Sequence, residues 1–143
     1  MRTFTLITCI VIVLGLASVT SAATSSPRVV TRSSTYSHIL FDGRSFVLYA
    51  FTHDRHGHST CSTACAKAWP PYLVRHKPSV GSGVKASLVG VVRRANGRLQ
   101  ATYAGHPLYY YVGDRKPGQI LCQGVSEFGG FWRVIRPSGT PVR

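Results

Sequence analysis

Five nitrogen and sulfur donors lie within thirteen residues of this chain. They follow the pattern His-x-x-His-x-His-x-x-Cys-x-x-x-Cys and are His53, His56, His58, Cys61 and Cys65. Imidazole and thiolate groups bind copper and zinc, so the segment is a candidate transition-metal site. If the two cysteines are oxidised, the three histidines alone remain as ligands. A redox-active pair is a further possibility, because Cys61 is expected near a helix N-terminus, where a thiolate is favoured.

The cysteines also allow a purely structural interpretation. After removal of an N-terminal export signal three remain, Cys61, Cys65 and Cys122, and the sequence permits three single pairings among them. Disulfides persist in secreted proteins. Two residues four apart on a helix have Cα atoms about 6 Å apart, which is within disulfide range. This spacing favours a structural Cys61–Cys65 disulfide beside a solvated histidine loop, and it leaves the fate of Cys122 open.

A second pattern with chemical content occurs twice. Residues 48–55 return sixty positions later as residues 108–115, and each copy has an upstream Gly and a downstream Gly and Cys. A duplicated supersecondary unit is the economical explanation. The shared motif residues are Tyr49, Phe51 and Asp54 in the first copy and Tyr109, Tyr111 and Asp114 in the second.

These motif residues have a structural and a functional interpretation. Alternation along a strand places both aromatic residues of a copy on one face, where they can cover a sheet or stack across a symmetry axis. Each Asp follows a strand and can fix its own loop. The alternatives are an aromatic platform for a flat or sugar-like ligand, and a hydrolytic pair made of Asp54 and Asp114 within about 10 Å of one another. We favour the structural interpretation.

The remaining sequence offers little for catalysis. The chain has only four acidic residues, no Gly-x-Ser-x-Gly elbow and no phosphate-binding Gly-rich loop. We therefore expect a protein that is not an enzyme, and no catalytic or cofactor-binding residue is assigned. Copper or zinc bound by His53, His56 and His58 is the alternative.

The charge balance points to anionic partners. Seventeen Lys and Arg against four Asp and Glu give a formal charge of +13, and the cations are dispersed rather than clustered. Such a surface attracts anionic envelope polymers or lipid head groups without defining a site. No nucleic-acid-binding module is recognisable, so specific nucleic-acid recognition is not expected. The oligomeric state is left undetermined.

The N-terminus has the features of a secretory signal. Arg2 precedes an apolar run over residues 4–16, and small residues follow. The run is shorter than the roughly twenty residues of a membrane span. We expect a signal peptide over residues 1–23, a disordered Ser/Thr-rich leader over 24–35, and a secreted or extracytoplasmic product. The alternative is anchoring of the protein by an uncleaved signal.

The rest of the chain predicts a mainly β fold, a small antiparallel domain at residues 36–137. Asp42-Gly43 predicts a type I′ hairpin between residues 37–41 and 45–51, and Asn96-Gly97 predicts a second between 88–92 and 99–103. A third hairpin turns at Ala104-Gly105 into 108–112, and a last strand covers 131–135. One short helix is expected near 61–69, ended by Pro70-Pro71. The two repeats, about 36–74 and 86–137, are then joined by a loop.

The motifs also resemble a known family. The string Cys-Ser-Thr-Ala-Cys-Ala-Lys-Ala-Trp-Pro-Pro at 61–71 and the strings at 105–114 and 129–132 resemble the bacterial secreted repeat of unknown function, lipoprotein-like proteins with a Tyr-x-aromatic-x-x-Asp motif. The resemblance implies an extracytoplasmic protein and covers both cysteines of the first copy, but not the three histidines. This chain lacks the lipobox, and Cys122 has no usual counterpart. We expect a non-enzymatic binding or structural module; the alternative is a metal-binding or redox-active protein using residues 53–65.

Overall fold

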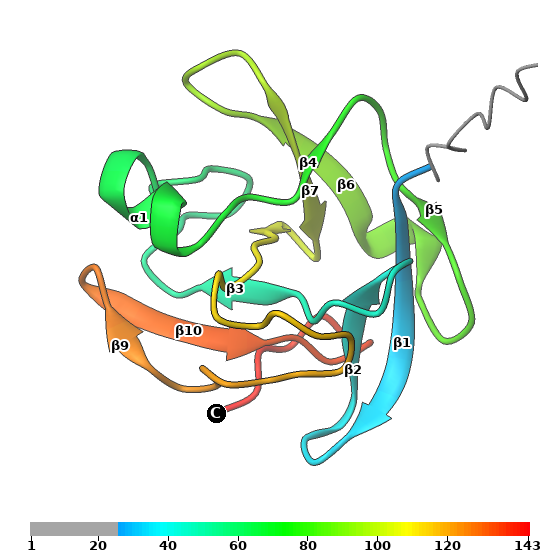
Figure 1. Ribbon diagram of the computed structural model, residues 1–143. Helices are drawn as coiled ribbons and strands as arrows, with labels where there is room; N and C mark the ends of the chain where they lie inside the picture. Colours follow the sequence, from blue (N-terminus) through cyan, green and yellow to red (C-terminus); the bar gives the residue numbers. More distant parts are fainter. Residues whose placement is uncertain (1–25) are drawn as a thin grey trace, which may run out of the picture.

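The computed structural model describes residues 26–143, so the expected signal peptide lies outside the described residues. These residues form the mainly β fold that the sequence predicts, and within them there are three small sheets and one short α-helix (Figure 1). The elements are β1 (Arg28–Ser34), β2 (Ser37–Asp42), β3 (Tyr49–Phe51), α1 (Thr63–Ala68), β4 (Leu73–Val74), β5 (Ser79–Val80), a 3₁₀ turn (Ala86–Leu88), β6 (Val89–Arg93), β7 (Leu99–Tyr103), β8 (His106–Pro107), β9 (Ser126–Glu127) and β10 (Gly130–Val134).

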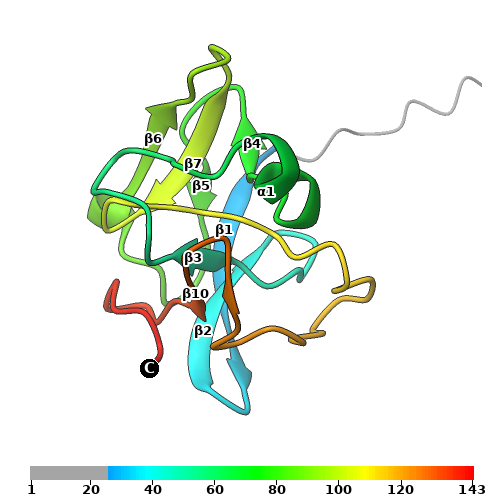
Figure 2. The ribbon, with the colours of Figure 1, turned by 90° about the vertical axis from the view of Figure 1, so that its left-hand side faces the viewer.

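Two of the sheets join the two repeats to one another. The strand orders of the sheets are β2-β1-β5, β3-β10-β9 and β4-β7-β6, and β8 pairs with β7. Strand β3 of the first repeat is antiparallel to β10 of the second, with Phe51 opposite Trp132. Strand β4 of the first repeat likewise pairs with β7 of the second. Figure 2 shows β3 and β10 near the middle of the molecule, with β4 and β7 above them.

Equivalent hydrogen bonds show how the repeats correspond. The Leu40 N–H donates to the Ile135 carbonyl at 2.9 Å, and the Ala101 N–H donates to the Tyr72 carbonyl at 2.9 Å. Ile135 lies three residues after Trp132, and Tyr72 lies three residues after Trp69. The segment that follows each tryptophan therefore completes the sheet of the other repeat, so neither repeat carries a complete sheet alone.

The hydrophobic core is shared in the same way. One cluster holds Trp69 of the first repeat and Trp132 of the second, and the other holds Leu48 and Leu108. All four side chains are fully buried. Because each cluster draws on both halves of the chain, we expect the two repeats to fold as one cooperative unit.

The prediction of a disordered leader over residues 24–35 is wrong for most of that segment. Residues 28–34 form β1, which pairs with β2 from Val29 to Ser34. Val29 is completely buried, and its burial together with the six-residue ladder stabilises this segment. The Ser/Thr-rich composition did not indicate this strand, because most of its polar residues face solvent.

The first predicted turn also differs from the structure. Gly43 does not adopt a positive φ, whereas Ser45 does (72°). The Asp42 carboxylate accepts the N–H groups of Arg44 and Phe46, both at 2.9 Å, and so builds a longer turn around its own side chain. A type I′ hairpin is therefore incorrect at this position. It is correct in form at Ala104-Gly105, where both residues have positive φ (48° and 79°).

Four further bounds differ from the prediction. The strand expected over 45–51 is regular only over β3. The strand expected over 108–112 is reduced to a bridge at Tyr109, and the short strand β8 lies just before it. The joining loop contains β5, which pairs in parallel with β1. The fold continues past residue 137, because Pro141 bridges to Ile135 and Val142 is buried. The helix and the β6–β7 and β10 elements lie where they were predicted.

Candidate functional site

The repeated Tyr and Asp residues meet at the centre of the molecule. Tyr49 and Tyr109 exchange two backbone hydrogen bonds of 2.9 Å, which makes them the central pair of the two repeats. The Tyr49 hydroxyl then donates to Asp114 at 2.7 Å, and the Tyr109 hydroxyl donates to Asp54 at 2.7 Å. Each tyrosine thus binds the carboxylate of the opposite repeat.

The same carboxylates hold their own loops. The second oxygen of Asp54 accepts the Thr60 N–H at 2.7 Å and its hydroxyl at 2.8 Å. The second oxygen of Asp114 accepts the Leu121 N–H at 3.0 Å. Both oxygens of each Asp are engaged in this way, so the arrangement fits a loop-fixing role better than acid catalysis.

Burial keeps these phenols protonated. Desolvation raises the pKa of Tyr49, and the neighbouring Asp114 raises it further. Desolvation and the charge of Asp54 raise the pKa of Tyr109. Burial raises the pKa of Asp114, although the hydrogen bonds from Tyr49 and Leu121 oppose that shift. The tyrosines therefore act as donors at neutral pH rather than as nucleophiles or bases.

The repeated aromatic residues enclose two tryptophans. The rings of Trp69 and Trp132 stack with centroids 3.9 Å apart and an interplanar angle of 2°. Phe51 stacks on Trp132 at 4.3 Å, and Tyr111 lies over Trp69 at 4.7 Å. Both tryptophans are 0 % exposed. The faces of the two tryptophans are buried against other aromatic rings inside the protein, so they do not form an open platform for a ligand.

The three histidines of the candidate metal site have separate surroundings. His53 packs beside Phe51, with ring centroids 5.8 Å apart, and the His56 ring lies against the backbone of Gly105. All three histidines are exposed. Within residues 26–143, no group of three or more His, Cys, Asp or Glu side chains is placed to hold a metal ion. The structure therefore does not gather His53, His56 and His58 into a three-ligand centre.

His106 belongs to the same region and was not singled out by the sequence. Burial lowers its pKa, and the neighbouring His56 lowers it further, while Asp54 opposes the shift. His106 begins β8 directly after the Ala104-Gly105 turn. It follows the upstream Gly of its copy, as Arg44 follows the upstream Gly of the first copy.

Cys61 and Cys65 form a disulfide with Cα atoms 5.3 Å apart. Cys61 lies just before α1 and Cys65 lies within it, so the bond closes the first turn of the helix. Cys122 is a free, partly exposed cysteine, and burial raises the pKa of its thiol. This environment does not favour a reactive thiolate.

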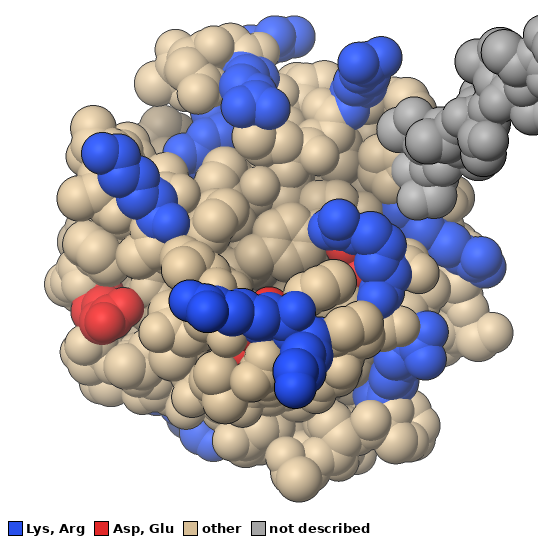
Figure 3. Space-filling view, in the orientation of Figure 1, with Lys and Arg blue, Asp and Glu red and all other residues tan. Residues whose placement is uncertain are grey.

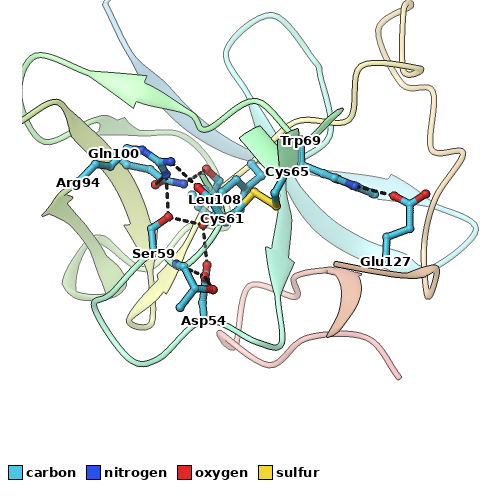
Figure 4. The surroundings of a disulfide bond; sticks show 11 residues. Asp54, Ser59, Cys61, Cys65, Trp69, Arg94, Gln100, Leu108 and Glu127 are labelled. Carbon is cyan, nitrogen blue, oxygen red and sulfur yellow. Dashed lines mark hydrogen bonds between the residues drawn. A yellow bond between two sulfur atoms is a disulfide. The ribbon is translucent and has the colours of Figure 1, made fainter. Parts of the chain in front are cut away.

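Arg94 anchors the disulfide segment to the second repeat (Figure 4). Its guanidinium donates to the Ser59 hydroxyl at 2.7 Å, to the Gln100 side chain and to the Cys61 carbonyl. Ser59 in turn contacts the Tyr109 hydroxyl at 2.7 Å. Sequence reasoning missed Arg94 and Gln100, because no local pattern distinguishes an arginine beside a turn from a solvated one.

A groove of about 700 Å³ lies between Ser26-Pro27, β4 and the start of β7. Its lining combines basic and apolar side chains and consists of Ser26, Pro27, Leu73, Val74, Arg75, His76, Arg98 and Leu99. Arg75, His76 and Arg98 are exposed, and no acidic residue lines the groove. It is a concave surface with two exposed arginines in its lining, Arg75 and Arg98, which suits an anionic chain.

Other cations are spread widely. Figure 3 shows Lys and Arg side chains on several sides of one face, with little acidic surface between them. The one ion pair within residues 26–143 joins Arg44 to Asp42 at 3.0 Å. Most of the positive charge is therefore not neutralised within the described protein.

Residues 90–136 match the family model of a secreted repeat of unknown function. The match covers most of the second repeat and confirms the family resemblance that the sequence predicts. No curated protein and no solved structure matches the chain. Within the described residues, no helix is long and apolar enough to cross a membrane.

Proposed function

Since the chain carries the secreted repeat of unknown function over residues 90–136, we propose that it is an extracellular or cell-envelope, non-enzymatic module that binds anionic polymers. The observation that carries the proposal is the groove whose lining includes Arg75, His76 and Arg98. The dispersed charge of +13 attracts polyanions from a distance, and the groove provides a concave surface on which they are held.

The motif residues support a binding rather than a catalytic role. The conspicuous side chains, Tyr49, Tyr109, Asp54 and Asp114, satisfy one another in the interior. These hydrogen bonds join the two repeats, so the repeat motif has a structural role. The groove lies on β4 and β7, whose pairing depends on that connection between the repeats.

The test uses poly(glycerol phosphate) as the probe and neutral dextran as its uncharged control. We expect the phosphate polymer to bind with an affinity that falls steeply with salt, and dextran not to bind. Arg75→Glu and Arg98→Glu should each weaken binding about fivefold or more, because each reverses a charge at the groove. Arg115→Glu is the matched control, since Arg115 is exposed and lies outside the groove lining.

Two results would count against the proposal. Equal weakening by Arg115→Glu would mean that only net charge matters, and equal binding of dextran would remove the electrostatic basis. The metal-binding alternative is distinguished by a triple variant. When His53, His56 and His58 are all replaced by Ala, the binding module should keep its full affinity for the phosphate polymer, whereas a metal-dependent protein should not.

A further inference from the structure

The two repeats differ at one sheet edge. Strand β1 pairs with β2, and β6 pairs with β7, in the same antiparallel arrangement. Thr31 lies opposite Leu40, and Val91 lies opposite Ala101. Leu40 and Ala101 are equivalent positions. The backbone N–H of each donates to the carbonyl of the residue that lies three positions after a stacked tryptophan. Thr31 and Val91 are therefore equivalent positions on the outer strands of the two hairpins.

In the first repeat that outer edge is covered. The segment at 79–82 runs parallel to β1. The Ser79 N–H donates to the Pro27 carbonyl at 3.0 Å, the Gly81 N–H donates to the Val29 carbonyl at 2.8 Å, and the Thr31 N–H donates to the Ser82 carbonyl at 3.4 Å. The chain thus supplies an added strand for one of its two equivalent edges.

In the second repeat the corresponding edge is open. The Arg94 N–H donates to the Arg98 carbonyl, and the Ala104 N–H donates to the Leu88 carbonyl. The backbone N–H and C=O groups of the even-numbered residues in and beside β6 therefore point toward β7. By alternation the backbone groups of Val91 and Arg93 point away from β7. Within residues 26–143 β6 pairs only with β7, and no backbone hydrogen bond reaches these outward groups or the Val89 carbonyl.

The surroundings of this edge are basic. Lys85 precedes the strand and Arg93 ends it, and both are exposed. The described acidic residues, Asp42, Asp54, Asp114 and Glu127, are engaged with other parts of the fold. A second copy of the chain would bring like charge against like charge, so β6-to-β6 pairing is disfavoured.

We propose that the outer edge of β6 binds an extended, acidic peptide segment of a partner protein as an added parallel strand, as the segment at 79–82 is added to β1. Backbone hydrogen bonds to Val89, Val91 and Arg93 supply the affinity, and Lys85 and Arg93 select acidic side chains. The proposal does not depend on the groove and uses a different surface from the polymer site.

The first experiment needs no protein variant. The probe is an acetylated, amidated peptide of four Thr-Glu repeats, titrated into the full mature chain and followed by the amide resonances of β6. Two further peptides carry N-methyl groups on every Thr or on every Glu. Since alternate residues of an added strand face β6, methylation of one set should weaken binding at least about tenfold, and methylation of the other set should change it less than about threefold.

Charge selection and location are tested in parallel. The peptide with Lys in place of Glu should bind at least about tenfold more weakly. Val91→Pro removes the edge-facing N–H and should abolish binding, whereas Val91→Thr retains that N–H and should bind as the parent does. If Val91→Pro fails to fold, the methylated peptides still decide the matter.

Several outcomes would overturn the proposal. Equal affinity of the two N-methylated peptides would exclude backbone pairing, and equal affinity of the Lys peptide would exclude acidic selection. Absence of detectable binding would mean that Arg93 merely protects a short edge from pairing. Self-association of the chain through β6 would mean that the edge binds a second copy and not an acidic partner.

Discussion

The two repeats share a frame but differ in what is attached to it. In each, a hairpin leads to a central tyrosine, an Asp-fixed loop and a buried tryptophan. The first repeat adds the Cys61–Cys65 disulfide and α1 after its loop, whereas the second has the free Cys122 and the β9–β10 hairpin. The frame residues contact across the repeats, and the differing residues include Cys61 and Cys65, which are buried in the shared core. The repeats therefore differ within the core as well as at the surface.

The comparison also explains why the motif is strict. A tyrosine that bound its own repeat's Asp would stabilise one half only. The observed crossing, Tyr49 to Asp114 and Tyr109 to Asp54, couples the halves. The following predictions test that coupling and the differences around it.

The largest effect is expected at the stacked tryptophans. Trp69→Ala and Trp132→Ala should each reduce the free energy of unfolding by about 3–5 kcal/mol, because each empties a shared core. Each variant should still unfold in a single denaturant transition. Two separate transitions, with one unaffected, would show that the repeats are independent.

A milder substitution separates the two tryptophans. The Trp69 indole N–H donates to Glu127 at 2.9 Å, whereas the buried Trp132 indole nitrogen has no partner within residues 26–143. Trp132→Phe should therefore be less destabilising than Trp69→Phe, since it removes an unsatisfied donor. The reverse order would contradict this assignment.

The next largest loss of unfolding free energy is expected on removal of the disulfide, which only the first repeat contains. Replacing Cys61 and Cys65 together by Ser should cost about 2 kcal/mol in denaturant unfolding, as expected for closure of a short loop. Cys122→Ser is the comparison at the partly exposed cysteine of the second repeat and should cost less than about 1 kcal/mol. Equal losses would mean that the disulfide contributes no specific constraint.

The crossed hydrogen bonds predict a specific pattern of coupling. In a double-mutant cycle, Tyr49→Phe should couple to Asp114→Asn by about 1 kcal/mol, and Tyr109→Phe should couple to Asp54→Asn similarly. The matched cycle of Tyr49→Phe with Asp54→Asn should show a clearly smaller coupling. Stronger coupling within a repeat than between repeats would refute the crossed arrangement.

The smallest effect is a pH dependence specific to the second repeat. Burial and His56 lower the pKa of His106 below its ordinary value of 6.5. The unfolded chain then binds more protons, so stability falls as the pH drops through and below 6.5 toward the lower folded-state pKa. His106→Asn should lose less stability between about pH 7 and pH 5 than the parent. His38→Asn, at an exposed site on β2, is the control.

Much of the fold could be predicted from local sequence. The Asn96-Gly97 turn, the helix before Pro70-Pro71 and the final strand follow from turn chemistry and residue type, which act over a few residues. The strand at 28–34 was missed because its stability comes from pairing with β2 and from burial of Val29, neither of which its Ser/Thr-rich composition reveals.

The sequence by itself determined that two copies of one unit exist, that the chain is basic, and that its elements are short β-strands. Only the tertiary structure decided that Trp69 and Trp132 stack on one another, that each Asp serves the opposite repeat's tyrosine, and that one of two equivalent edges is open. The physical reason is distance along the chain. Turns and alternation are local properties, whereas the pairing of residues some sixty positions apart depends on how two copies pack, which either copy alone does not specify.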